Sequence, residues 1–438
     1  MSAGTVGIGA GTGEAMHAMA RELFPICRSI TGEGLRETLR RISARIPLEM
    51  QEVASGSVAF DWTVPKEWNI RQAWIKDPAG NTVVDFRDHS LHVLNYSVPI
   101  HRKMSLAELR PHLHTLPGNP DWIPYRTSYY QEQWGFCLTH RRLQSLPEGE
   151  YEVCIDSTLE AGSLSYGELF LPGESADEIL FSTHVCHPSL ANDNLSGIVV
   201  ATELAQTLAA APRRHSFRFL FLPGTIGSIT WLSRNEAGAR RIKYGLVLAG
   251  LGDAGGLTYK RSRRGDTVID RAAAHVLAST GPHLLRDFHP YGYDERQFCS
   301  PGFNLAVGRL SRTPFGEYPE YHTSGDDLAF VKPAQLEGAL RACLEIVDIL
   351  EHDSRFVNLN PNCEPQLGKR GLYGATGGPH DRAAVETALL WVLNQSDGEN
   401  SLLDIARRSG LAFAAVLKAK ELLQEKGLLA PAGTRKEP

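Results

Sequence analysis

The spacing of hydrophobic side chains divides the chain into stretches that predict different secondary structure. Between residues 14 and 46, apolar positions recur at intervals of three or four, which predicts two amphipathic helices around a Gly-Glu-Gly break at 32–34. From residue 56 to residue 149 the pattern changes to short strand-like runs that prolines and turn residues interrupt. Such runs predict a β-rich module, and we expect its many aromatic residues to be mostly core, with a minority lining a binding site.

Beyond residue 150, short and mostly apolar runs alternate with segments of helical periodicity. The runs at 178–183 and 217–222 predict buried strands, and the segments that follow each of them predict helices. Buried strands separated by helices are typical of an α/β domain with a largely parallel sheet, in which chemistry gathers at the carboxyl ends of the strands. We expect this domain to comprise residues 14–55 and 150–365, with residues 56–149 as the inserted β-rich module.

The two ends of the chain differ from the rest. Residues 1–13 are rich in glycine, alanine and threonine, which predicts a disordered tail. A glycine-rich linker at 371–379 precedes a last stretch of short helical segments. We interpret residues 380–438 as three helices and a short terminal hairpin, which resembles a winged-helix domain.

Composition and charge narrow the class of protein. The 438 residues are 42% apolar and 22% charged, as in ordinary globular proteins, and the net charge of −5 does not indicate nucleic-acid binding. No apolar run approaches the ~18 residues that a membrane span needs, and the chain lacks the basic start and apolar core of a signal peptide. The seven cysteines are scattered without C-x-x-C spacing, so we expect a protein of the reducing cytoplasm.

The C-terminal stretch is electrically neutral, because residues 381–438 contain eight Lys or Arg and eight Asp or Glu. A neutral winged helix lacks the positive charge that binds phosphates. We therefore expect no nucleic-acid partner, and we interpret this stretch as a subunit-packing or substrate-gating domain, which leaves a homo-oligomer open.

The densest candidate chemistry follows the predicted buried strand at 178–183. His184 comes at its end, His187 three residues later, and Asp193 just before an apolar helix. Imidazole and carboxylate together suit zinc or a similar divalent ion. The alternative is that Asp193 or Asn194 caps the helix and that the two histidines are ordinary polar loop residues.

Two further clusters follow later strands. His322 lies among carboxylates and tyrosines between residues 317 and 327, and an aspartate four residues downstream could orient its imidazole. Asp253 follows another predicted buried strand and is a candidate ligand. The alternatives are a solvated polar loop around His322 and a turn-capping role for Asp253.

Charged residues near these clusters could hold the ends of a substrate. Asp294 and Arg296 stand together, and Arg263 belongs to a run with Arg261 and Arg264. The planar guanidinium group suits carboxylate or phosphate because it donates hydrogen bonds in pairs. The alternative for the arginine run is a solvated surface.

Taken in order, these motifs resemble the zinc aminopeptidase family, which also includes the glutaminyl cyclases. They are DNLSG (193–197), PGTIGS (223–228), YDERQF (293–298) and YHTSGD (321–326). A closer resemblance is to a bacterial branch of aminopeptidase-like proteins with a C-terminal winged helix, often encoded beside polysaccharide or natural-product biosynthesis genes. The shared motifs are FDWTVPKEWNIR (60–71), LHVLNYS (91–97), YYQEQWGFCL (129–138) and CHPSLANDNLSG (186–197).

The resemblance implies a three-layer α/β/α zinc-peptidase-like core with a mixed, largely parallel sheet. It implies a Zn²⁺-dependent amide hydrolase that acts on a small peptide or amino-acid conjugate. The implied metal ligands are His184 or His187, with the choice open, then Asp193, His322 and Asp253. The substrate-binding candidates are Asp294, Arg296, Tyr321 and Arg263.

One departure from the family concerns the general base. Where the aminopeptidases place a glutamate, this sequence has Gly224, which cannot accept a proton or bind a metal. We expect Glu317 or Glu320 to substitute, with Glu295 as a further candidate, and one bound ion rather than two. Two alternatives stay open: a hydrolytically degenerate protein that binds a ligand or scaffolds partners, and a metal-assisted cyclase or acyl transferase.

Overall fold

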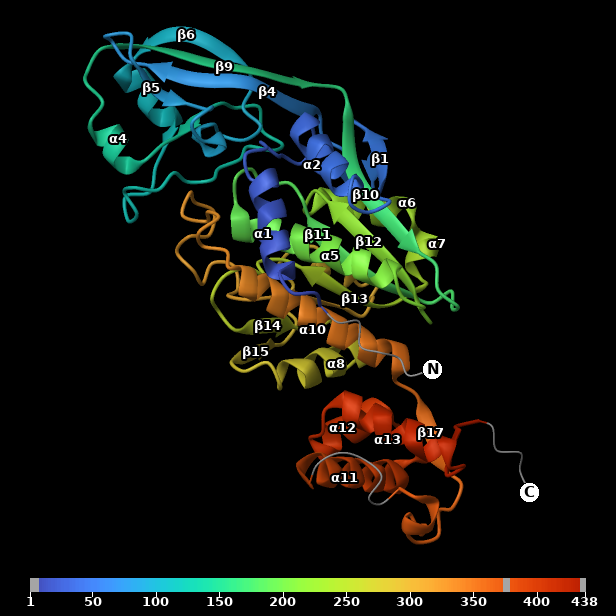
Figure 1. Cartoon of the computed structure of the whole chain (residues 1–438). Helices are drawn as coiled ribbons and strands as arrows, with labels where there is room; N and C mark the ends of the chain where they lie inside the picture. The colour runs from blue at the N-terminus through green and yellow to red at the C-terminus, as the bar shows by residue number, and fades with distance from the viewer. Residues whose placement is uncertain (1–7, 373–378, 434–438) are drawn as a thin grey trace. The chain divides into compact units, whose positions relative to one another are not determined.

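The computed structural model describes residues 8–372 and 379–433. The chain forms two compact units (Figure 1). The first comprises Met1–Asp270 and Leu277–Leu344, and the second comprises Arg271–Val276 and Glu345–Pro438. Most of the glycine-rich linker expected at 371–379 lies outside the described residues.

An eight-stranded mixed sheet forms the centre of the first unit. The neighbouring strands β12, β11, β13 and β16 run parallel to one another, while β1 and β10 join them antiparallel at one edge. At the other edge β14 lies antiparallel to β16 and parallel to β15. In spatial order the strands are β1 (Glu49–Ala54), β10 (Ser163–Leu171), β12 (Ser216–Leu222), β11 (Glu178–His184), β13 (Ile242–Leu248), β16 (Val307–Ser311), β14 (Leu257–Lys260) and β15 (His283–Arg286).

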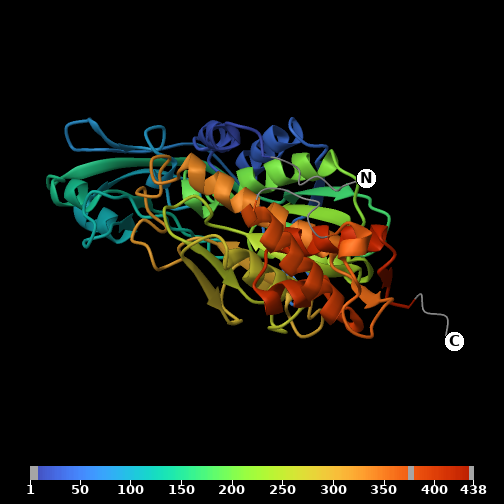
Figure 2. The ribbon, with the colours of Figure 1, turned by 60° about the horizontal axis from the view of Figure 1, so that its bottom comes forward.

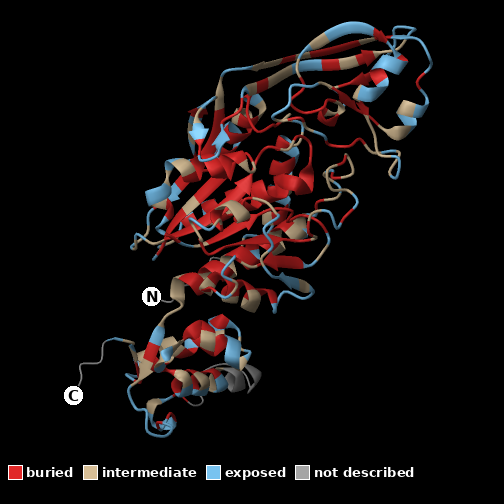
Figure 3. Ribbon diagram, turned by 180° about the vertical axis from the view of Figure 1, so that it is seen from behind, coloured by how far each residue is buried: buried red, intermediate tan, exposed pale blue. Residues whose placement is uncertain are grey.

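Helices cover both faces of this sheet. The chain passes from β11 through α5 (Gly197–Ala209) to β12 on one side, and from β12 through α6 (Ile226–Arg234) back past β11 to β13 on the other. Because both crossovers connect parallel strands with the same right-handed sense, α5 and α6 lie on opposite faces. Every residue of β11 is buried, as the sequence predicted for this strand, and Figure 3 shows the central strands in the buried colour. The expected α/β/α core is confirmed.

The two predicted N-terminal helices are α1 (Thr12–Leu23) and α2 (Glu33–Ser43). Each buries one apolar face, and α1 packs against α5, as Figures 1 and 2 both show. The structure begins α1 at Thr12, so the end of the expected tail is helical. Residues 1–7 lie outside the described residues.

The β-rich module contains a four-stranded antiparallel sheet. In spatial order its strands are β5 (Thr82–Asp85), β4 (Glu67–Lys76), β9 (Glu150–Glu160) and β6 (Ile100–Ser105). Its longest strand, β9, lies beyond residue 149, where we expected the main domain to resume. One hydrophobic cluster runs through both regions, and it joins Trp68 and Tyr151 of the module to Leu220 and Trp231 of the α/β core. The module therefore shares its core with the domain that contains it.

The remaining elements up to residue 352 are short, apart from two longer helices whose residues are divided between the two units. The strands are β2 (Val58–Ala59), β3 (Trp62–Thr63), β7 (Leu113–His114) and β8 (Phe136–Cys137). The helices are η1 (Ser90–His92), α3 (Leu106–Leu109), η2 (Arg110–His112), α4 (His140–Gln144), η3 (Ala191–Ser196), α7 (Glu236–Ala239) and α9 (Glu295–Phe298), with the longer α8 (Val268–Leu277) and α10 (Pro333–His352).

The second unit contains the winged helix. A three-stranded antiparallel sheet in the order β18-β17-β19 accompanies three helices, of which α13 packs against both α11 and α12. The first strand of the sheet lies before residue 380, where we expected the domain to begin. The elements are β17 (Arg355–Asn358), η4 (Gly368–Arg370), α11 (Pro379–Gln395), β18 (Asp397–Ser401), α12 (Leu402–Ser409), α13 (Phe413–Glu425) and β19 (Leu429–Pro431).

Two sequence expectations concern membrane-spanning helices and disulfide bonds. Among the described residues, no helix has the length and apolar character needed to cross a bilayer. All seven cysteines are free thiols, five of them buried, with Cys363 exposed. The cysteines therefore form no disulfide framework.

Candidate functional site

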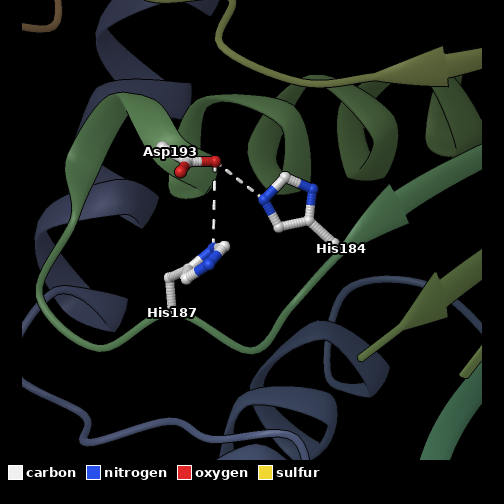
Figure 4. A group of neighbouring side chains, drawn as sticks. All are labelled: His184, His187 and Asp193. Carbon is white, nitrogen blue, oxygen red and sulfur yellow. Dashed lines mark hydrogen bonds and ion pairs between the residues drawn. The ribbon is translucent and has the colours of Figure 1, made fainter. Parts of the chain in front are cut away.

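The candidate site lies at the carboxyl end of β11. His184 is the last residue of this strand and pairs with Leu222 at the end of β12. Its Nε2 lies 2.8 Å from Oδ1 of Asp193, and both side chains are almost completely buried. Figure 4 shows the two groups facing each other across the loop that leads from β11 to α5.

His187 completes the group from within this loop. Its Nδ1 lies 3.8 Å from Asp193 Oδ1, and this buried nitrogen has no hydrogen-bond partner among the described residues. Burial lowers the pKa of His187 to about 3, so the imidazole is neutral and offers a lone pair. The backbone of the loop is fixed from outside, because the buried Arg28 donates from Nε to the His187 carbonyl at 2.8 Å.

Asp193 is held in place through its backbone. The Asp326 carboxylate accepts hydrogen bonds from the main-chain N–H groups of Asn192 and Asp193. Asp326 therefore positions Asp193, whereas we expected the aspartate at this place to orient the His322 imidazole. Asn194 donates to the His184 carbonyl and to Thr183, and neither Asp193 nor Asn194 caps α5.

His322 reaches the other oxygen of the same carboxylate. Its Nε2 lies 3.0 Å from Asp193 Oδ2, and its ring stacks on Tyr321 with 3.9 Å between ring centroids. Burial opposes ionisation of Asp193, but the charge and hydrogen bonds of the surrounding histidines hold the pKa of its carboxyl well below the usual range. The carboxylate is therefore ionised and bridges the histidines.

These residues fit a divalent metal ion. One ligand atom from each of His184, His187 and Asp193 can be chosen so that all three lie within 4.8 Å of one another. Two imidazoles and a carboxylate form a donor set that zinc accepts. The unpartnered His187 Nδ1 is the observation that tests the fit, since a buried nitrogen without a partner is costly unless something binds it. His322 stands beside this group as a further candidate ligand.

The structure does not bring Asp253 to this group. Its carboxylate is occupied by hydrogen bonds from Asn192 Nδ2, Gly255 N and the backbone and hydroxyl of Thr313, at 2.6–3.4 Å. Asp253 therefore organises the loop after β13, which is close to the turn-capping alternative. Asp253 does follow the buried strand β13, but several residues of loop separate it from the end of that strand.

A cavity of about 360 Å³ opens in front of the histidines. Three separate parts of the chain line it: the strand ends of the α/β core, the loop before α9, and the segment at 125–129 from the β-rich module. The module is tied to His322, whose carbonyl accepts from Tyr125 N at 2.8 Å. The lining residues are Tyr125, Arg126, Thr127, Tyr129, His184, His187, Gly224, Thr225, Gly292, Tyr293, Asp294, Tyr321 and His322.

Asp294 faces the position left open by Gly224. A Cβ atom placed on Gly224 would lie 3.2 Å from His184 Cβ and 3.7 Å from Asp294 Oδ2. Ser228 donates to Asp294 Oδ1 at 2.7 Å, whereas the buried Oδ2 has no hydrogen-bond partner among the described residues. Burial raises the pKa of Asp294 to about 6. Asp294 is therefore a carboxyl group that can exchange a proton near neutral pH beside the histidines.

The other expected site residues are divided between the cavity and the surface. Tyr321 lines the cavity, but neither Glu317 nor Glu320 does. Glu317 forms an exposed bidentate ion pair with Arg286, with N–O distances of 2.6 and 2.7 Å. The structure therefore does not place Glu317 or Glu320 among the residues that line the cavity, and their expected role as the base stays a prediction.

The two expected substrate-binding arginines also lie elsewhere. Arg263 donates to Asn304 at 3.0 Å on the exposed surface, outside the cavity. The Arg296 guanidinium lies 5.6 Å from the centre of the Tyr291 ring, and its Nε is buried without a hydrogen-bond partner among the described residues. Neither arginine belongs to the residues that line the cavity.

Sequence reasoning missed Tyr293 and Tyr125, two of the tyrosines that enclose the histidines. Tyr293 stacks on His184 and donates to Asp193 Oδ1 at 3.3 Å, and burial raises the pKa of Tyr293 well above its usual value. Tyr125 packs edge-on against both His187 and His322. We expected a minority of the module's aromatic residues to line the site, and Tyr129 is one that does. No local sequence pattern pairs Tyr125 with His322.

A large mixed sheet with helices on both faces, and histidines with an aspartate beyond the carboxyl end of β11, place the fold in the class of peptidase-like proteins. The fold agrees with that of BSAP, a zinc aminopeptidase from Bacillus subtilis, at a TM-score of 0.56 and 12% identity, over 77% of this chain and 93% of that one. At this identity the likeness concerns the fold.

The chain belongs to the family described as "Domain of unknown function (DUF4910)", which residues 17–353 match. Residues 354–431 match the winged helix-turn-helix family. Over 419 residues the chain is 51% identical to a Clostridium acetobutylicum protein named "Putative polysaccharide biosynthesis protein with aminopeptidase-like domain", covering 95% of this chain and 96% of the relative. A crystal structure of a "putative peptidase" from Clostridium acetobutylicum has a TM-score of 0.92 and 50% identity, with 96% of each chain covered.

Proposed function

We propose that this protein is a metal-dependent amide hydrolase that acts on a small amino-acid or peptide conjugate. The observation that carries the proposal is the convergence of His184, His187 and Asp193 on one point, at the end of a cavity that also holds a protonatable Asp294. The peptidase-like fold and the aminopeptidase-like domain in the name of the relative support the same class of reaction.

His184, His187 and Asp193 would hold one divalent ion and leave a position open for the substrate, while His322, a further candidate ligand, lies against the other oxygen of Asp193. When bound, zinc supplies Lewis acidity to the reacting carbonyl. Two features of the chain favour a single ion. Gly224 offers no carboxylate where the family has one, and the Asp253 carboxylate is occupied by its own loop.

Asp294 serves as the proton carrier. Its free Oδ2 accepts a proton from the attacking water while the water oxygen bonds to the carbonyl carbon. The same carboxyl then returns the proton to the nitrogen as the C–N bond breaks. Ser228 holds Oδ1 and so aims Oδ2 into the cavity. A pKa of about 6 suits both halves of this exchange near neutral pH, because the group is then neither fully protonated nor too weak a base.

The tyrosines set the size and character of the substrate. Tyr125, Tyr129, Tyr293 and Tyr321 give the cavity aromatic walls, and Arg126 is its single Lys or Arg side chain. A volume of about 360 Å³ admits a single amino-acid or sugar-sized group next to the reacting amide. The name of the Clostridium acetobutylicum relative favours a conjugate from polysaccharide biosynthesis. The seven free cysteines favour action in a reducing compartment.

A hydrolytically silent protein that binds a similar ligand is the second candidate, and Gly224 is the observation that favours it. A glutamate side chain at this position would enter the space between His184 and Asp294. If the natural protein is inactive and Gly224→Glu gains hydrolysis, the second candidate holds. Gly224→Ala is the matched control, because it adds the Cβ without the carboxylate.

The test of the first candidate is turnover of a panel of small amides by the full chain with and without zinc. The panel contains aminoacyl anilides, N-acyl amino acids and amides of amino sugars. We expect turnover that a chelator abolishes, that zinc restores, and that His187→Ala loses. His101→Ala, on the exposed surface of β6, should keep it. Zinc-independent turnover, or turnover that survives His187→Ala, would contradict the proposal.

A further inference from the structure

A second cavity lies in the first unit, apart from the one that holds the histidines. Its volume is about 450 Å³, and none of its lining residues lines the first cavity. It is bounded by α7, the start of β13, the loop before β16 and the tip of the β2–β3 hairpin. The lining residues are Phe60, Glu236, Arg240, Ile242, Lys243, Arg264, Gly302, Phe303, Asn304, Leu305 and Ala306.

The charges around this second cavity are predominantly positive. Arg240, Lys243 and Arg264 line it against one carboxylate, Glu236. Lys243 lies 3.5 Å from Asp177, but no ion pair of Arg240 or Arg264 occurs within residues 8–372 and 379–433. Two guanidinium groups without carboxylate partners, at the rim of one hollow, are suited to a doubly charged oxyanion such as phosphate.

The hairpin tip adds an aromatic surface that the fold alone does not explain. Phe60 occupies the first position of the two-residue turn between β2 and β3, with φ at 55°, and 48% of it is exposed. A bulky side chain in the left-handed region costs energy, and glycine or asparagine would be the usual residue in such a turn. The ring meets Phe303 edge-on at 5.9 Å, and the neighbouring Trp62 is 47% exposed.

The hairpin packs against a helix that begins at the wall of the first cavity and leads toward the second. It packs against α6, which begins next to Thr225 in the wall of the first cavity. The chain that leaves this helix forms α7, whose Glu236 lines the second cavity, as does Arg240 just beyond the helix. Exposed aromatic residues that cluster beside a hollow mark a binding surface.

We propose that the second cavity binds a phosphate or diphosphate ester that carries a ring. Arg240, Lys243 and Arg264 hold the phosphoryl oxygens, and Phe60 stacks on the ring. The site requires no hydrolysis and no metal, so it does not depend on the proposed reaction. A sugar phosphate and a nucleoside diphosphate both present this chemistry, and the test separates them.

The test is isothermal titration calorimetry of the full chain with pyrophosphate, glucose 1-phosphate and UDP. We expect the natural protein to bind at least one of the two ring-bearing esters more tightly than pyrophosphate, and the tighter ester identifies the source of the ring. Arg240→Gln and Arg264→Gln should each weaken that binding at least tenfold. Arg102→Gln, which removes an exposed arginine from β6, is the charge-matched control and should leave it unchanged.

Phe60→Asn tests the aromatic contact without harming the hairpin, because asparagine tolerates the left-handed turn better than phenylalanine. It should weaken binding of the ring-bearing ester at least fivefold and leave pyrophosphate binding unchanged. His187→Ala should keep all binding, which excludes phosphate held at the metal centre. The proposal is overturned if no ester binds, if His187→Ala abolishes binding, or if Arg264→Gln behaves like Arg102→Gln.

Discussion

At the scale of single residues, two buried atoms without hydrogen-bond partners among the described residues carry the account. His187 Nδ1 faces Asp193, and Asp294 Oδ2 faces the space beside Gly224. Buried polar groups are nearly always satisfied in folded proteins, so an unsatisfied atom on a residue that lines a cavity is a candidate for binding or reaction. A metal ion would satisfy the first atom, and a reacting water would satisfy the second.

Replacing Asp294 tests its role in proton transfer. Asp294→Asn keeps an acceptor for the Ser228 hydroxyl but cannot carry a proton, so we expect kcat to fall about 10²- to 10⁴-fold with little change in KM. Steady-state kinetics on the best amide of the panel measures this. Glu317→Gln is the control and should keep full activity, because Glu317 is paired with Arg286 at the surface. A variant Asp294→Asn with normal kcat would remove Asp294 from the mechanism.

Asp294 should also affect stability in a pH-dependent way. Burial raises its pKa from 3.8 to about 6, so the folded metal-free protein binds this proton more tightly than the unfolded chain does. The resulting stabilisation is complete below pH 3.8 and is lost as the pH rises through about 6. Asp294→Asn should therefore be more stable than the natural metal-free protein at pH 7, by at most about 3 kcal/mol.

Urea unfolding at two pH values checks this expectation. The stability difference between Asp294→Asn and the natural protein should shrink toward zero at pH 4, where the natural aspartate is protonated in the folded state. A difference that is the same at pH 4 and pH 7 would show that Asp294 is not titrating in this range.

The sequence was informative about the residues that follow β11 and less so about those farther along. His184, His187 and Asp193 lie within ten positions of one another, so one strand end and one helix start were enough to place them together. Asp253 and Glu317 occupy similar loops after strands, but only the three-dimensional path of each loop decides whether its side chain turns inward. Asp294 was expected to bind substrate, whereas the role of proton carrier that we propose for it depends on Ser228 and Gly224, which no spacing rule connects to it.

At the scale of elements, the segment at 122–129 of the β-rich module forms one wall of the cavity. It is joined to the segment after β16 by two hydrogen bonds: Ser324 N donates to the Ile123 carbonyl at 2.8 Å, and Ile123 N donates to the side-chain Oγ of Ser324 at 2.9 Å. This junction places Tyr125 against His322. The module therefore helps to build the site, in addition to extending the core.

Weakening this junction should impair substrate binding more than the chemical step. Ser324→Ala removes the acceptor for Ile123 N, which should cost about 0.5–1.5 kcal/mol of stability. We expect KM to rise several-fold while kcat changes less than twofold, because the metal ligands and Asp294 keep their places. Ser145→Ala is the control, since the Ser145 hydroxyl donates a hydrogen bond to the Arg142 carbonyl at an exposed position of the same module. If Ser324→Ala leaves KM unchanged, the wall does not contact the substrate.

Sequence patterns predicted the buried strands of the core well and the module's boundaries less well. β11 and β12 are short, mostly apolar runs between helical segments, a pattern typical of buried strands in the middle of a sheet. β9 belongs to the sheet of the module, although its residues follow the expected boundary at 149. Its alternating pattern fits either sheet, so the sequence alone could not assign it. Long-range pairing with β4 and β6 decided the matter, and that pairing is invisible in a single sequence.

At the scale of the whole molecule, the chain combines a peptidase-like unit with a winged helix. Winged helices often bind DNA, which requires clustered positive charge to neutralise phosphates. The neutral composition of residues 381–438 provides no such excess, and the whole chain carries a net charge of −5. We therefore propose that the winged helix of this protein packs subunits together or gates substrate access and does not bind DNA.

This proposal predicts negligible DNA binding. The full chain at micromolar concentration should not shift the fluorescence anisotropy of a labelled 20-base-pair duplex at 150 mM salt. Lowering the salt to 50 mM should bring no large gain, because few phosphates are neutralised. Salt-sensitive binding at submicromolar concentration would contradict the proposal and would make the winged helix a nucleic-acid module.

The central claim is that His184, His187 and Asp193 hold one divalent ion. The direct measurement is the zinc content of the full chain after loading and exhaustive removal of loosely bound metal. The account predicts about one zinc ion per chain, lost in His187→Ala and kept in His101→Ala. Zinc should also raise the melting temperature of the natural protein, because a ligand that binds the folded state stabilises it. A chain that holds no zinc, or that keeps its zinc after His187→Ala, would contradict the account.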